Sequence, residues 1–306
     1  MKVSSVVSGH LAAFSAYVIF GLNVIVCKDI ANHNAISPMA LFCFRAVGAT
    51  TIFWLLSFFA PKEKIPFRDL CSIFVASMFG LFLTQITFLK AITITTPFDT
   101  AVISTIVPIM TMFVSAIFLK EPITLKKAIG VLISFSGVLF LIFNSVHAPS
   151  SVEKSTLLGI VLMILNGLFF AFYLGVFRPL IAKYNVVNFM KWMFLFSMIV
   201  SLPFATSDII TTNYCLFTPK LILDIAYLII LATCVSYFLI PFGQKRLRPT
   251  IISMYSYIQP IIAAGVSIYL GMDTISILKI FAASLVFVGV AVVNQSKARA
   301  DIESKQ

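Results

Sequence analysis

Ten long apolar stretches, separated by short polar connections, follow one another along the chain. A membrane-spanning helix needs roughly 20 consecutive apolar residues, and each stretch is close to that length. Only helices and closed barrels satisfy their backbone groups in lipid, and barrel strands would show shorter segments of alternating hydrophobicity. The pattern therefore predicts an all-α integral membrane protein with ten transmembrane helices. We expect these helices near residues 9–27, 37–60, 69–89, 97–118, 125–143, 157–177, 188–206, 220–241, 250–270 and 277–293.

The composition supports this fold class. The chain has 306 residues, of which 60% are hydrophobic and 11% charged, and its mean hydropathy is +1.05. Soluble domains carry about 25% charged residues, so we exclude a soluble or disordered protein and expect the lipid bilayer to surround the chain. The net charge of +11 is spread over short connections rather than gathered on one polar face. That distribution argues against nucleic-acid binding.

Lysine and arginine residues are divided unevenly between the two sides of the predicted membrane. The two chain ends and alternate connections carry sixteen of them, whereas the other five connections carry one each. Cytoplasmic loops of membrane proteins carry an excess of positive charge. We therefore predict a multi-pass protein of the cell membrane with both termini in the cytoplasm, which agrees with an even number of spans.

The second half of the chain repeats the first. At an offset of 152 residues, the matching pairs include Pro97 with Pro249, Ser104 with Ser256, and Pro108 with Pro260. We divide the chain into two units of five spans, residues 9–143 and 157–293. Because five is odd, the second unit must be inverted in the membrane, and the bias in loop charge has changed sides accordingly. Inverted repeats are a transporter architecture that places the substrate site near the membrane midplane.

Several short motifs resemble the EamA repeat of the drug/metabolite transporter superfamily. They are Ala91 after the third span, Pro108 within the fourth, the Leu119-Lys120-Glu121-Pro122 turn, Gly130 and Gly137, and Ser37-Pro38 followed by Arg45. The second copy departs from this pattern, with Met272-Asp273-Thr274 at the turn and Leu195 in place of Arg45. The resemblance implies ten helices, cytoplasmic termini and export of small metabolites, but it fixes no substrate.

Polar side chains form stripes on matched spans of the two units. Lipid offers hydroxyl and amide groups no partner, so these faces must meet protein or water. We interpret them as a substrate path, and close helix packing through small polar residues is the alternative. The mid-span prolines favour a path because each removes a backbone hydrogen bond and permits a kink. The candidates for the path are Asn23, Thr84, Gln85, Ser104, Pro108, Asn166, Tyr173, Ser236, Tyr237, Ser256, Tyr257 and Pro260.

Arg45 is the one basic residue well inside a predicted span. An arginine at the membrane centre costs about 2.5–3.5 kcal/mol on insertion scales, so its side chain should face the protein and meet an acid or backbone carbonyls. Asp99, near the start of the fourth span, is the expected partner. A structural clamp between these two spans and a contact to a substrate anion both remain open.

These features favour a secondary-active transporter that exports small metabolites, such as amino acids or amphiphilic compounds, by alternating access between the two units. Uptake, or antiport of sugar phosphates or nucleotide sugars, is the alternative among transporters, although a phosphate site should need several buried basic residues. We do not expect an enzyme, because no acids, histidines or metal ligands converge at one depth. No cofactor or metal is expected, and the proton-motive force is a candidate energy source. The oligomeric state stays open, and a monomer is compatible with the sequence.

Overall fold

The computed structural model describes residues 2–118, most positions between 125 and 140, residues 155–270 and residues 277–294. Within that part the chain is all-helical and contains no strand, which confirms the predicted helical class, while the count of ten spans stays a prediction. Seven helices are long and apolar enough to cross a membrane. Three shorter apolar helices accompany them, over Ala128–Gly137, Ile251–Ala263 and Ile280–Gly289.

Five helices run without a break. They are α1 (Lys2–His33), α2 (Pro38–Ser57), α8 (Leu157–Val176), α10 (Val186–Thr211) and α15 (Ile277–Asn294). Side-chain caps explain where some of them begin, because the side chain of a cap accepts a bond from an otherwise unpaired helical amide. Ser37 caps α2 in this way and Thr156 caps α8. Helices α1 and α10 extend beyond the predicted spans 9–27 and 188–206, since helical backbone continues into the polar ends.

The remaining long helices are interrupted near their middles. Two contain a π-helical segment: α3 (Phe67–Ser77) continues through η1 (Met78–Leu83) into α4 (Thr84–Thr93), and α11 (Pro219–Tyr227) continues through η3 (Leu228–Val235) into α12 (Ser236–Gln244). Two others are bent: α5 (Pro97–Ser104) leads into α6 (Val107–Phe118), and α13 (Pro249–Met254) leads through the 3-10 turn η4 (Tyr255–Tyr257) into α14 (Ile258–Tyr269). Two short elements complete the described chain, α9 (Arg178–Lys183) and η2 (Tyr214–Leu216).

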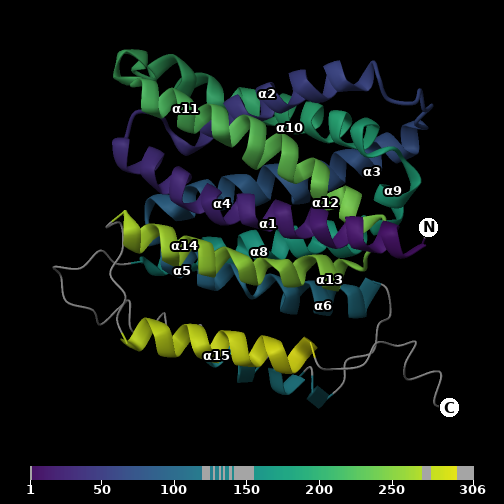
Figure 1. The fold of residues 1–306 in the computed structure, drawn as a ribbon. Coiled ribbons are helices and arrows are strands. Elements are labelled where there is room, and N and C mark those ends of the chain that lie inside the picture. The colour runs from purple at the N-terminus through teal and green to yellow at the C-terminus, as the bar shows by residue number, and fades with distance from the viewer. Residues whose placement is uncertain are drawn as a thin grey trace.

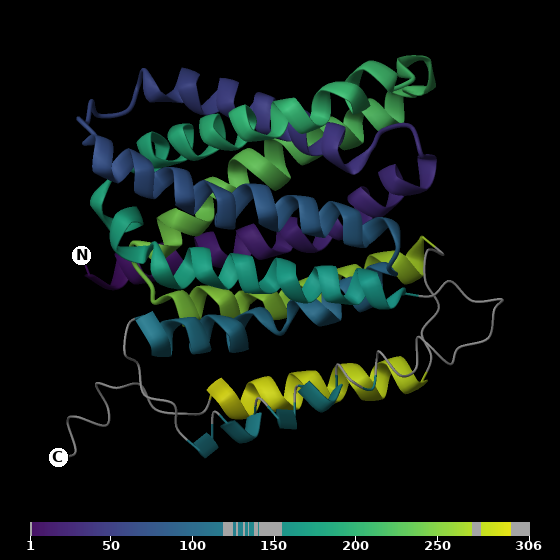
Figure 2. The ribbon, with the colours of Figure 1, turned by 180° about the vertical axis from the view of Figure 1, so that it is seen from behind.

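The helices lie roughly side by side in one bundle (Figure 1). Helix α1 occupies the middle, where it packs against α12, α14 and α4. Helix α15 lies at one edge in both views (Figures 1 and 2). The first turn of α1 and the last turn of α15 lie at the same end of the bundle.

Helices α2 and α10 pack along their lengths and are tied together at both ends. At one end the Ser37 hydroxyl donates to Asp208 Oδ2 over 2.5 Å. At the other end Asn188 Nδ2 donates to Glu63 Oε2 over 2.9 Å and to the carbonyl of Pro61 over 2.7 Å. Polar contacts at both ends fix the register of this pair, which forms one wall of the bundle.

Some predicted features lie outside the described residues. They include the Leu119–Pro122 turn and the Met272–Thr274 turn. Of the predicted span 125–143, the described positions are helical.

Candidate functional site

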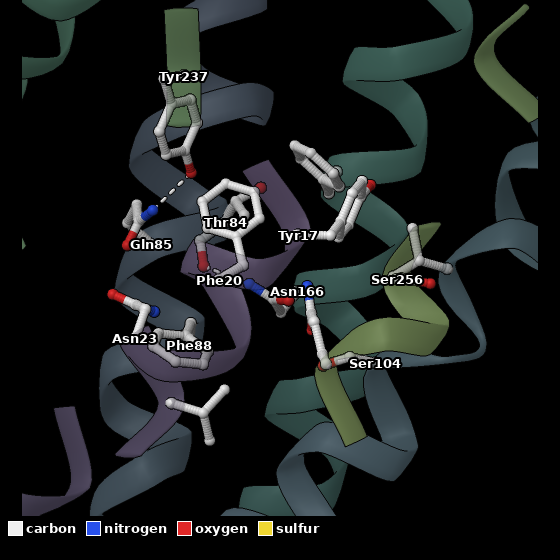
Figure 3. Close-up of a pocket in the computed structure, with 14 residues that line it drawn as sticks. Tyr17, Phe20, Asn23, Thr84, Gln85, Phe88, Ser104, Asn166, Tyr237 and Ser256 are labelled. Atoms are coloured by element: carbon white, nitrogen blue, oxygen red, sulfur yellow. Dashed lines mark hydrogen bonds between the residues drawn. The ribbon is translucent and has the colours of Figure 1, made fainter. Parts of the chain in front are cut away.

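A cavity lies at the centre of the bundle, between α1, α8 and the interrupted helices (Figure 3). The centres of water molecules could occupy about 70 Å³ of it. Among the described residues that line it, none is charged. Its polar lining consists of Tyr17, Asn23, Thr84, Gln85, Ser104, Asn166, Tyr237, Ser256 and Gln259. Its apolar lining consists of Phe20, Val24, Phe88, Val107 and Phe170.

Gln85 and Tyr237 meet across this cavity. The Gln85 amide Nε2 donates to the Tyr237 hydroxyl over 2.5 Å (Figure 3), and both side chains are buried. The Tyr237 ring is held edge-on by the rings of Phe20 and Phe194, at centroid distances of 5.7 and 5.8 Å. The two bonded residues are 152 residues apart, which is the offset of the sequence repeat.

The π-helical segments place these two side chains. Segment η1 ends directly before Thr84 and Gln85, and η3 ends directly before Ser236 and Tyr237. A π-helix bonds each amide five residues back, so it changes the direction of the side chains that follow it. Hydroxyl groups bond the carbonyls five residues back: Thr84 Oγ1 donates to Phe79 O over 2.5 Å, and Ser236 Oγ donates to Leu231 O over 3.2 Å. Segments of this kind occur frequently at functional sites.

Two prolines bend the helices that supply Ser104 and Ser256. A proline inside a helix removes the amide that would bond the carbonyl four residues earlier. For Pro108 that carbonyl belongs to Ser104, and for Pro260 it belongs to Ser256. Both prolines are buried beside the cavity lining without being part of it. Their effect on the site is therefore through the backbone.

The two asparagines take different roles at the cavity wall. Asn166 Nδ2 donates to the carbonyl of Thr84 over 2.6 Å, which ties α8 to the start of α4. Asn23 Oδ1 accepts a weak bond from the Cys27 thiol, at 3.6 Å. Asn166 thus positions the helix that carries Gln85.

Three buried polar atoms of the lining have no hydrogen-bond partner within the described part of the chain. They are the Tyr17 hydroxyl, Gln85 Oε1 and the Ser256 hydroxyl. Buried polar groups are nearly always paired in proteins, so each exception calls for an explanation. These two hydroxyls and one amide oxygen could bond a small polar ligand in the cavity.

Five of the predicted path residues do not line the cavity: Pro108, Tyr173, Ser236, Tyr257 and Pro260. Tyr173 packs its ring against the backbone of η1, where a Cβ on Gly80 would lie 2.5 Å from it. Tyr257 turns its ring toward Phe287 of α15, at 6.3 Å between centroids. The repeat matches residues of the two units along the sequence, but it does not decide which face of each helix turns inward.

Four aromatic residues of the lining are absent from the prediction, which named only Tyr237 among the aromatic residues that line the cavity. Tyr17, Phe20, Phe88 and Phe170 look in the sequence like the many residues that face lipid or fill a core. Gln259 was detectable, because it lies three residues after Ser256 and so on the same face of its helix.

Arg45 and Asp99 do not pair with each other, which corrects the predicted contact. Arg45 Nε donates to Thr233 Oγ1 of η3 over 2.8 Å, and Asp99 Oδ2 accepts from the Ser155 hydroxyl over 2.6 Å. Both residues are buried. The reason is the direction of α2, whose Arg45 face packs on η3 rather than on the start of α5.

These features define a multi-pass α-helical membrane protein with an uncharged polar site at its centre. Two segments of the chain, residues 7–143 and 157–295, each match the EamA-like transporter family, and together they span most of the sequence. The chain belongs to this family.

Individual relatives are distant. An "Uncharacterized transporter" from Archaeoglobus fulgidus is 29% identical over 154 residues, which cover 50% of this chain and 52% of that protein. An "Uncharacterized transporter in sor 3'region" from Acidianus ambivalens is 25% identical over 186 residues, covering 58% of this chain and 68% of that protein. The chain thus spans about half of the first relative. A solved crystal structure matches 95% of this chain and 96% of its own with a TM-score of 0.66, at 16% identity, which shows the fold alone.

Proposed function

We propose that this protein is a secondary-active exporter of small, neutral or zwitterionic metabolites such as amino acids. In this proposal, ten helices form two inverted five-helix repeats in the cell membrane, and the substrate binds in the central cavity. The observation that carries the proposal is the position of that cavity, at the interruptions of four helices. Discontinuous helices meeting near the midplane are a recurring design of transporter binding sites.

The interruptions of the helices occur at matching positions in the two units, and this supports the inverted repeat. Segments η1 and η3 begin at Met78 and Leu228, 150 residues apart, and the bends near Ser104 and Ser256 are 152 residues apart. The Gln85–Tyr237 hydrogen bond joins two positions that the repeat makes equivalent. Two equivalent positions can touch only near the axis that relates them, so this bond supports a site on that axis.

The lining supports the substrate class. Hydroxyl and amide groups can bond both a carboxylate and an ammonium group, and aromatic faces suit an apolar side chain. A phosphorylated sugar or nucleotide would call for several basic side chains, because phosphates are bound through charge-assisted hydrogen bonds. The described lining offers none, which favours the exporter over the sugar-phosphate alternative.

Ion pairs at opposite ends of the bundle support alternating access. At one end Lys183 of α9 and the Tyr184 hydroxyl both bond Asp69, and this hydrogen bonding raises the pKa of Lys183. At the other end Lys220, at the start of α11, bonds Asp29; Figure 1 shows α9 and α11 at these two ends. The lysines of both pairs are exposed to solvent, and such pairs are weak, so one end could open while the other stays closed.

Substitution of the lining tests the proposed site. Gln85→Leu, Ser104→Leu, Tyr237→Leu and Ser256→Leu should each abolish export and leave the amount of protein in the membrane normal. The matched control is Thr51→Leu, an exposed position on α2 whose hydroxyl bonds only its own helix. A growth-rescue screen against toxic amino acids and metabolites supplies the substrate for the assay. Export that survives all four substitutions would show that the polar stripes serve helix packing.

Cysteine labelling tests the proposed orientation. In a background without the native cysteines, single cysteines at Ser150 and Thr212 should react with an impermeant reagent in intact cells. A cysteine at Lys64 should react only after the membrane is opened. The reverse pattern would overturn the cytoplasmic placement of the termini.

A further inference from the structure

The Arg45 guanidinium is buried with most of its donors unused. Its side chain is 1% exposed, and Nε alone has a partner, Thr233 Oγ1. Neither terminal nitrogen has a hydrogen-bond partner among the residues that the structure describes. Arginine carries five N–H donors, and a buried charge without partners is strongly unfavourable. An ionisable group inside a membrane that is left in this state points to a ligand.

A second pocket lies at the connection between α1 and α2. It is formed by the end of α1, the start of α2 and the end of α4, and includes Cys27, Leu41 and Leu89. The centres of water molecules could occupy about 230 Å³ of it. Its lining is largely apolar, with Asn34, Ser37 and Thr93 as its polar members, and none of its described lining residues is charged.

Helix register places Arg45 between this pocket and the central cavity. On α1, Asn23 lines the cavity and Cys27, one turn later, lines the second pocket. On α2, Leu41 lines the second pocket and Arg45 lies one turn deeper on the same face. Its partner Thr233 lies one turn from Tyr237 of the cavity lining.

The wall between the two cavities is therefore about one helical turn thick, or ~5.4 Å. Helices α1 and α4 contribute to the linings of both cavities, whereas the described residues of α2 line only the second pocket. A molecule that moves from one cavity to the other must pass this wall. Arg45 is part of neither lining, but its register on α2 places it beside this wall, with two terminal nitrogens available.

We infer that Arg45 binds the carboxylate of the transported molecule as it passes between the central cavity and the second pocket. This inference rests on the proposed function and narrows its substrate class to small monocarboxylates, amino acids included. A guanidinium binds a carboxylate through two parallel N–H···O bonds, and the two terminal nitrogens of Arg45 supply these donors. One cation beside two cavities whose described linings carry no charged side chain matches one negative charge and disfavours a dianionic phosphate.

Thermal unfolding of the full chain in lipid nanodiscs tests this inference, with leucine, phenylalanine and their carboxamides as probes. The acids should stabilise the wild type at concentrations about tenfold or more below those of the amides, since a hydrogen bond to a charged group is worth about 1.5–3 kcal/mol. Arg45→Gln should abolish this preference and Arg45→Lys should retain part of it. Thr233→Val removes the one observed contact of Arg45 but keeps the charge, so it should keep the preference.

The outcomes separate the two proposals. Equal stabilisation by acids and amides, or an acid preference that persists in Arg45→Gln, overturns the role of Arg45 and leaves the central cavity as the site. If Arg45→Gln does not fold, the test rests on Arg45→Lys. If that variant binds the acids as tightly as the wild type does and prefers them over the amides to the same extent, the proposed role of Arg45 is wrong. If no acid stabilises the wild type, both this role and the amino-acid class are wrong. A third outcome is that Arg45→Gln and Thr233→Val both lose stability while both still prefer the acids over the amides. Arg45 would then serve only to clamp α2 to η3 through Thr233.

Discussion

Gly80 offers a sharp test of how the two repeats pack around the site. It lies in η1, and an alanine Cβ there would be 2.5 Å from Tyr173 Cδ2 and 2.7 Å from Cγ. Carbon atoms in contact are normally about 3.5–4.0 Å apart, so the overlap is roughly 1 Å. The Tyr173 ring is fully buried and stacks on Phe170, at 6.0 Å between centroids. It therefore has little freedom to move aside.

We expect Gly80→Ala to destabilise the protein by about 1–2 kcal/mol. Overpacking of a core costs typically 1–3 kcal/mol, and the better helix propensity of alanine offsets about 0.5–1 kcal/mol. The assay is unfolding in detergent micelles with rising dodecyl sulfate, together with export. Export should fall too. The clash pushes on Tyr173 of α8, and the same helix supplies Asn166 and Phe170 to the cavity.

Gly265→Ala is the matched control, because among the described residues no atom beyond the chain neighbours and the backbone of its own helix lies within 4 Å of a Cβ at that position. It should be neutral or stabilising by up to about 1 kcal/mol. Adding Tyr173→Leu to Gly80→Ala should cost less than the sum of the two single changes, since the clash is then removed. Equal stability of Gly80→Ala and Gly265→Ala, or strict additivity of the pair, would refute the packing argument.

Two further expectations concern buried polar groups. Tyr237→Phe removes the acceptor of the buried Gln85 amide and should lower the free energy of unfolding by about 1–3 kcal/mol. Tyr173→Phe removes a hydroxyl that has no partner among the described residues, so it should be nearly neutral in the same unfolding assay. Arg45→Ala and Asp99→Ala should have additive effects on stability, because their observed partners differ; a coupling energy above about 0.5 kcal/mol in the double-mutant cycle would contradict the separation of these two residues.

The sequence by itself determined the helical class and the matched positions of the polar residues in the two repeats. Lipid forces every apolar run into a helix, so hydropathy alone predicted the helical fold that the structure confirms. The repeat alone placed Gln85 opposite Tyr237 and Ser104 opposite Ser256. All four line the central cavity, as the proposed inverted repeat would require.

The tertiary structure decided which faces turn inward and which charges find partners. Hydropathy does not reveal a π-helical segment, since an extra residue per turn changes direction without changing composition. The aromatic lining was hidden for a related reason, because a phenylalanine facing the cavity and one facing lipid look the same in a sequence. The partner of Arg45 depends on which helix packs against α2, and that choice is made by long-range packing between the two halves of the chain. Periodicity within one helix carries no information about it.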